Sequence, residues 1–180
     1  MGKTRPHKQK ASKSRANKPA SKQKMNESPS ALLEQATILL QTGQADAALS
    51  LAEKALETAP EDSPSTLSGV NLVAEICIEL GEVDAAREYF IHAVELDPNG
   101  SIPESEGGGA EKFLWLAQLS ENGGADSVGW FEKGVSALRQ AIQQIESKAD
   151  PEDAVELEEK KRKMANALCG VAEIYMTDLS

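Results

Sequence analysis

The sequence contains few aromatic residues and no long apolar run. Phe, Trp and Tyr make up 4% of the 180 residues, whereas hydrophobic residues as a whole make up 40%. Any core must therefore be built mainly from Ala, Leu, Ile and Val, which suit closely packed helices better than strands. No stretch approaches the roughly 20 apolar residues needed to span a bilayer, and no apolar run follows the basic N-terminus as in a secretory signal. We expect no membrane association.

Cysteines and catalytic motifs are also scarce. Cys77 and Cys169 are too few for a disulfide framework, and both stand in apolar helical patterns, where cysteine behaves as a small buried hydrophobe. This usage indicates an intracellular protein with reduced thiols. The chain has no Cys-x-x-Cys, His-Glu-x-x-His or Gly-x-Ser-x-Gly motif. We therefore expect a protein that is not an enzyme and has no metal, cofactor or small-molecule substrate.

The net charge of −10 is unevenly distributed. Residues 1–28 hold nine of the 19 basic residues and one of the 29 acidic residues, so this segment carries +8 and the remaining 152 residues carry −18. The segment has no aromatic or branched aliphatic residue to repay the entropy of ordering, and we predict a disordered basic tail. Dense positive charge attracts phosphates and import receptors alike. Residues 1–28 could therefore serve as a nuclear-import signal, as a weak contact for nucleic acid or only as a solubilising tail.

An import signal would place the protein in the nucleus as well as the cytoplasm. The candidate import residues are Lys3, Arg5, Lys8, Lys10, Lys13, Arg15 and Lys18.

Two stretches of the chain repeat at an offset of 38 residues. The sequence Gly-Gln-Ala-Asp-Ala-Ala at 43–48 is matched by Gly-Glu-Val-Asp-Ala-Ala at 81–86, and residues 55–60 are matched by 93–98. Self-similarity at such a period is typical of stacked repeats. It favours a protein that binds another chain over an enzyme.

Apolar residues at helical spacing predict pairs of helices joined by Gly turns and ended by Pro. The predicted units are about 29–62, 67–99, 110–148 and 151–180, and the last is incomplete because its second helix is missing. We expect this chain to be the front part of a longer array. A Gly-rich insertion at about 99–109 separates the second and third units. Its Gly run is not a phosphate-binding loop, since no Gly-Lys-Ser/Thr follows it.

These features resemble the tetratricopeptide repeat (TPR), with strong similarity in the first two units and weaker similarity beyond. The resemblance implies an all-α, TPR-like helical-hairpin solenoid. The repeat is longer than the usual length of about 34 residues, and we place the extra residues, 63–66, between units.

Residues 109–119 and 173–179 carry a closer resemblance, to a fungal family of TPR assembly chaperones dedicated to the fourth large-subunit ribosomal protein (L four). The resemblance implies that the protein binds this newly made ribosomal protein through its long internal loop. It also implies protection from aggregation and delivery to nuclear pre-ribosomes. The −18 charge of the repeat body fits a basic client, although acidic surfaces also serve solubility alone.

In stacked helix pairs the first helices line a concave face. Helical phase turns one set of residues away from the partner helices, and these are the candidate client-binding residues. We expect the glutamates to pair with Lys or Arg of the client and Asn71 to bond its backbone, although each could be an ordinary solvated residue. The set is Leu33, Thr37, Gln41, Asn71, Glu75, Ile78, Glu79, Gln118, Glu121 and Glu173.

Two alternatives remain open. A general TPR adaptor or co-chaperone without a ribosomal client would share the fold, but one that grips an acidic tail needs a basic groove. An RNA-binding factor would act through residues 1–28 and would lose its salt-dependent binding when they are deleted.

Overall fold

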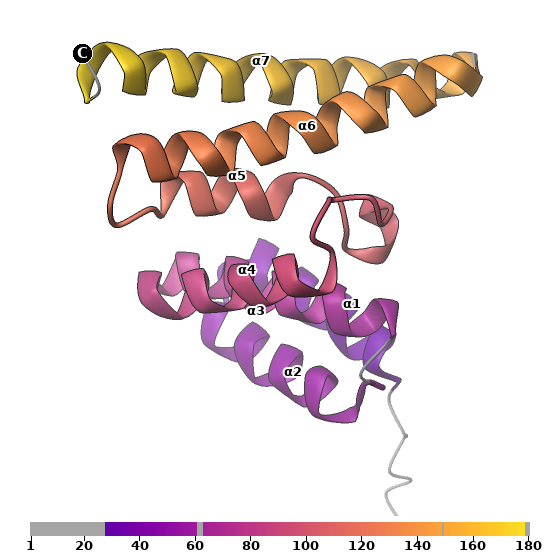
Figure 1. Ribbon diagram of the computed structural model, residues 1–180. Helices are drawn as coiled ribbons and strands as arrows, with labels where there is room; N and C mark the ends of the chain where they lie inside the picture. Colours follow the sequence, from indigo (N-terminus) through magenta and orange to yellow (C-terminus); the bar gives the residue numbers. More distant parts are fainter. Residues whose placement is uncertain (1–27, 61–62, 149, 179–180) are drawn as a thin grey trace, which may run out of the picture.

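The computed structural model describes residues 28–60, 63–148 and 150–178, and these residues form helices and connecting turns without a strand. Figure 1 shows the helices stacked from α1 and α2 at one end to α7 at the other. The predicted all-α helical-hairpin solenoid is confirmed, whereas the predicted disordered tail lies, but for Ser28, outside the described residues. The helices are α1 (Pro29–Gln41), α2 (Ala45–Thr58), α3 (Pro64–Leu80), α4 (Val83–Leu96), α5 (Glu111–Gln118), α6 (Gly124–Lys148) and α7 (Ala154–Thr177), with short 3-10 turns η1 (Glu104–Glu106) and η2 (Pro151–Asp153).

Local sequence signals explain where the first helices begin and end. The hydroxyl of Ser28 accepts a hydrogen bond from the Ala31 N–H at 3.3 Å, and Pro29 occupies the first turn of α1. Gly43 and Gly81 follow α1 and α3 with φ of +77° in both cases, and a Cβ at either position would meet nothing within 4 Å. Glycine is favoured at these two turns by backbone conformation rather than by lack of space.

Helix α3 begins at Pro64, three residues before the predicted start at Leu67. The hydroxyl of Thr66 donates to the carbonyl oxygen of Pro60 at 2.7 Å and lies 3.2 Å from the hydroxyl of Ser63. The placement of residues 63–66 between units was therefore wrong, because residues 64–66 extend α3 by most of a turn. The second helices of the second and third units, which we predict from the sequence to begin at about Ala85 and Ser127, begin two and three residues earlier, at Val83 and Gly124.

Small residues allow the paired helices to pack closely. Ala36 of α1 and Ala48 and Ala52 of α2 are fully buried. Gly134 plays the same part between α6 and α5, because a Cβ there would lie 2.6 Å from Cδ2 of Leu114. The apolar core then continues along the stack through Phe90 and Leu116. Each pair thus buries its apolar face partly against its neighbour, as repeat architectures require.

Several apolar side chains in the second half of α7 are exposed. Leu168, Tyr175 and Met176 are 44%, 53% and 77% exposed. Ala172, which the repeat pattern predicts to occupy the buried position of Ala36 in the first unit, is exposed as well. None of the helices in the described ranges is both long enough and apolar enough to cross a membrane.

Candidate functional site

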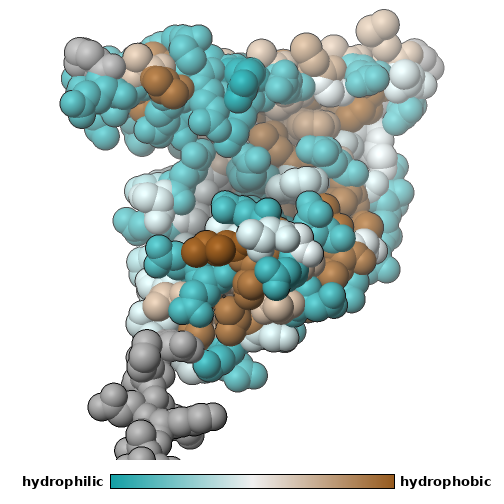
Figure 2. Space-filling model, turned by 180° about the vertical axis from the view of Figure 1, so that it is seen from behind, coloured by the Kyte–Doolittle hydropathy of each residue, from teal (hydrophilic) through white to brown (hydrophobic). Residues whose placement is uncertain are grey.

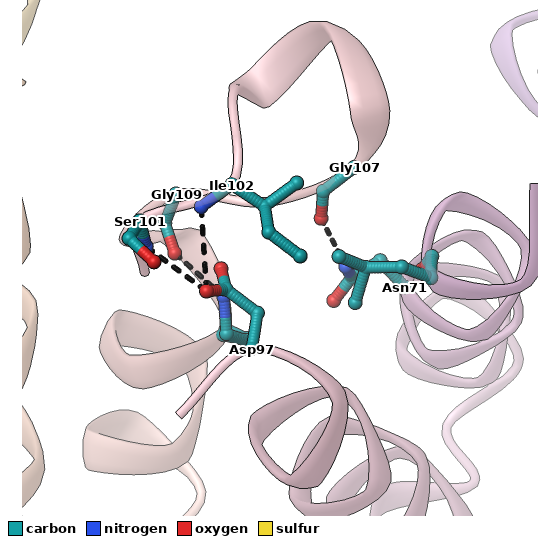
Figure 3. Close-up of polar contacts among 8 residues, drawn as sticks. Asn71, Asp97, Ser101, Ile102, Gly107 and Gly109 are labelled. Carbon is teal, nitrogen blue, oxygen red and sulfur yellow. Dashed lines mark hydrogen bonds and ion pairs between the residues drawn. The ribbon is translucent and has the colours of Figure 1, made fainter. Parts of the chain in front are cut away.

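The Gly-rich segment between α4 and α5 folds back onto α3. The side-chain amide of Asn71 donates to the carbonyl oxygen of Gly107 at 2.7 Å (Figure 3). Gly107 has φ of +82°, and a Cβ there would come within 2.6 Å of the Ser68 backbone. Only glycine permits this approach without displacing the loop. The insertion is therefore a packed part of the solenoid.

A buried ion pair fixes the two ends of this loop. The Lys112 ammonium lies 2.7 Å from the Asp97 carboxylate, and the two residues are 1% and 2% exposed. Asp97 also accepts the N–H groups of Ser101 and Ile102 at 2.9 and 3.4 Å (Figure 3). Lys112 donates to the carbonyl oxygen of Gly109 at 2.8 Å. Burial lowers the pKa of Lys112, against the opposing effect of Asp97. The hydrogen-bonding partners of Lys112 come from the loop or its ends.

Helix α7 contacts the same loop from the other side. The Lys160 ammonium lies 2.9 Å from Glu104 and 3.2 Å from Glu156. Burial by itself would lower the pKa of Lys160, but its two glutamate partners hold that pKa above its ordinary value. The loop thus joins the second unit to the fourth.

A polar hollow of about 440 Å³ opens beside this loop. Burial raises the pKa of Glu75 in its wall, the Glu111 carboxylate raises it further, and Lys163 has the opposite effect. The charged groups that line the hollow are three carboxylates, those of Glu75, Glu104 and Glu111, and two ammonium groups, those of Lys112 and Lys163. The lining residues used below are Leu33, Thr37, Asn71, Glu75, Glu111 and Lys163.

A second hollow, of about 340 Å³, lies between α5 and α7. Leu114, Trp115 and Phe131 make its wall largely apolar. It adjoins the first hollow because Glu111 and Lys163 line both, and these two residues form an ion pair at 3.2 Å. Figure 2 shows the molecule from behind, with hydrophobic residues over the lower helices and in the recess beneath the upper ones. We call the two hollows together the groove.

Five of the ten predicted client-binding residues line this groove: Leu33, Thr37, Asn71 and Glu75 in the polar hollow, and Gln118 in the apolar one. The other five line neither hollow: Gln41, Ile78, Glu79, Glu121 and Glu173.

Two of the predicted residues already have partners within the chain. Glu121 pairs with Arg87 of α4, whose Nε donates to the carbonyl oxygen of Leu119 at 2.9 Å. The Asn71 amide donates to the loop. Their roles toward a client remain predictions.

Sequence reasoning missed the charged residues that the loop and α7 bring into the groove. Glu104 stood in a segment interpreted only as an insertion, and Lys163 in the predicted fourth unit, where the charged run 156–163 predicts only a solvated helix face. Glu111 lies in the segment 109–119 that carried the closer resemblance, which was the one available signal. The import residues between Lys3 and Lys18 lie outside the described residues. Among the residues that the structure describes, no group of three His, Cys, Asp or Glu side chains could hold a metal ion.

Comparison with known proteins identifies the class first. The profile of the tetratricopeptide repeat family matches residues 39–103, which run from the end of α1 into the loop between α4 and α5. Residues 39–103 thus match the tetratricopeptide repeat family, and the stacked helical pairs have the fold that this match predicts.

Particular relatives then agree with the closer resemblance. A protein of Emericella nidulans described as "Probable assembly chaperone of rpl4" is 70% identical over 145 residues, which cover 77% of this chain and 38% of that protein. A protein of the same description from Schizosaccharomyces pombe is 33% identical over 132 residues, covering 73% of this chain and 34% of the relative. The chain thus spans little more than a third of the length of these curated relatives.

A solved structure completes the comparison. The assembly chaperone of RpL4 (Acl4, residues 1–338) superposes with a TM-score of 0.79 at 44% identity, covering 84% of this chain and 56% of that chain. The resemblance to fungal TPR assembly chaperones of this ribosomal protein, predicted from residues 109–119 and 173–179, is therefore confirmed.

Proposed function

We propose that this chain acts as an assembly chaperone that holds a newly made, basic large-subunit ribosomal protein of the rpl4 type in its groove. It shields the client from aggregation and escorts it to pre-ribosomes, moving between cytoplasm and nucleus. The function is binding, without catalysis. The observation that chiefly supports this proposal is the 70% identity to a probable assembly chaperone of rpl4.

The charge of the groove supports the same proposal. The chain beyond residue 28 carries −18, and the polar hollow is lined by three carboxylates against two ammonium groups, with Glu75 the carboxylate that has no ion-pair partner among the described residues. Ribosomal proteins are basic because they bind RNA phosphates, and the carboxylates of this chain carry the same negative charge as those phosphates. Electrostatic fields of opposite sign speed the encounter of two proteins and disfavour binding of wrong partners.

The basic tail would supply transport in this proposal. Lys3, Arg5, Lys8, Lys10, Lys13, Arg15 and Lys18 form a segment that an import receptor would read through its positive charge. Weak contact with nucleic acid would have the same electrostatic origin.

The test is calorimetric titration of the 180-residue chain with purified rpl4, with lysozyme as a basic protein of unrelated fold. We expect a complex with rpl4 that weakens as salt is raised, and much weaker binding of lysozyme. Equal affinity for the two proteins, or no complex with rpl4 at low salt, would overturn the proposal. Deleting residues 1–28 should leave the affinity unchanged and abolish nuclear accumulation of a fluorescent fusion.

A further inference from the structure

The apolar hollow between α5 and α7 has the form of a side-chain pocket. Leu114 and Trp115 of α5, Phe131 of α6 and Ala167 of α7 contribute apolar surface. Polar residues that are themselves exposed stand at its rim, and they are Gln118 and Asn166. A concave apolar site with a few polar groups at its edge is the usual form of a binding pocket.

The aromatic walls of this hollow are held in place. The Trp115 ring stacks on Phe90 with centroids 6.1 Å apart and an interplanar angle of 13°. The Phe131 ring abuts α7 at Gly170, where a Cβ would lie 3.0 Å from the ring. Walls fixed in this way lose little conformational freedom when a ligand binds. The hollow is therefore preformed.

Charge at the boundary between the two hollows indicates what kind of chain would enter. The Glu111–Lys163 ion pair lies at this boundary. In the part of the chain that the structure describes, the Glu75 carboxylate forms no ion pair, and its raised pKa reflects burial first and Glu111 second. A cation placed beside Glu75 and Glu111 would relieve both effects. The surrounding charge of −18 favours a cationic chain in the same way.

We propose that the apolar hollow receives an aliphatic or aromatic side chain of an extended, basic client segment, and that a neighbouring Lys or Arg of that segment pairs with Glu75 and Glu111 in the polar hollow. This inference rests on the proposed function and specifies what the client presents. Side chains two residues apart in an extended strand share a face and lie about 7 Å from each other. The recognised segment thus carries an apolar residue and a cation at alternate positions.

The experiment uses overlapping fluorescent peptides that cover rpl4, with binding to the 180-residue chain measured by anisotropy. The first pair of variants is Glu75→Gln and its control Glu79→Gln, which removes the same charge one turn further along α3 and outside both hollows. The second pair is Asn166→Arg at the rim of the apolar hollow and its control Gln143→Arg at an exposed position of α6. All four substituted residues are partly or fully exposed, and circular dichroism checks that each variant is folded.

We expect Glu75→Gln to weaken the tightest peptide roughly five- to thirtyfold at low salt, and Glu79→Gln by no more than about twofold. Asn166→Arg should weaken binding of the same peptide by about tenfold, and Gln143→Arg should weaken it only slightly. Both variants add one positive charge, but only Asn166→Arg adds it at the apolar hollow. Replacing the apolar residue of the peptide by Asp should abolish binding. Replacing its cation by Gln should cost less in the Glu75→Gln variant than in the wild type, because the two groups are coupled.

The outcomes separate this inference from the proposed function. If rpl4 binds but each variant behaves like its control, the groove assignment is wrong and the chaperone proposal stands. If neither rpl4 nor any of its peptides binds, the proposed function fails and the inference fails with it. Binding by peptides that have basic residues but no apolar one would also overturn the inference, since charge alone would then suffice.

Discussion

Replacing Lys112 by Met should destabilise the third unit strongly. The ammonium of Lys112 lies 2.7 Å from the Asp97 carboxylate, and both side chains are 1% exposed. Water therefore screens little of their interaction, and the value for a buried pair applies rather than the small one for surface pairs. Removing one partner of a buried pair costs about 3–5 kcal/mol, because the other charge stays buried without its counter-ion.

Urea denaturation provides the assay. With a slope of about 2 kcal/mol per M, a loss of 3–5 kcal/mol lowers the midpoint by about 1.5–2.5 M. Trp115 and Trp130 lie in α5 and α6, so tryptophan fluorescence reports on the third unit, which contains Lys112, whereas circular dichroism reports on all helices.

The control is Lys161→Met, which removes a lysine paired with Glu146 at 3.1 Å while both are about half exposed. We expect it to cost less than about 1 kcal/mol. The double variant D97N/K112M should recover part of the loss, because no unpaired buried charge is left. A Lys112→Met midpoint no lower than that of Lys161→Met would refute the reasoning, since the buried pair would then contribute nothing that an exposed pair lacks.

Three further predictions concern the groove and the core. The pKa of Glu75 is raised in the folded chain, so ionisation of this side chain lowers the stability of the fold as pH rises through that pKa. The Glu75→Gln variant should therefore melt at a higher temperature than the wild type near pH 7 and at the same temperature near pH 4. A lower melting temperature of the variant near pH 7 would contradict this. Gly107→Ala places a Cβ against the Ser68 backbone at positive φ, which should cost about 1–3 kcal/mol and speed amide hydrogen exchange in the loop. Phe113 is fully buried, and Phe113→Ala should cost about 3–5 kcal/mol in urea denaturation, whereas a loss below about 1 kcal/mol would mean that the core collapses into the cavity.

The class of the protein could be predicted because its evidence is local and repeated. Gly43 and Gly81 mark equivalent turns, and Ala36 and Ala48 mark the contact of one helix pair. Each signal depends on backbone conformation or side-chain size within a few residues, and the 38-residue offset presents most of them twice. The start of α3 was missed because Ser63-Pro64 was interpreted as a linker, although a Ser followed by Pro also opens α1.

The sequence by itself determined the stack of helical pairs, the acidic charge of the repeat body and the resemblance to fungal assembly chaperones. Only the tertiary structure decided that the Gly-rich loop packs on α3 and reaches α7, and that Glu75 shares the polar hollow with Glu111 and Lys163. The physical reason is the distance along the chain between the residues that interact. Helix formation and turns depend on neighbours along the chain, whereas Glu75 and Lys163 are 88 residues apart and come together only through the stacking of all the units between them.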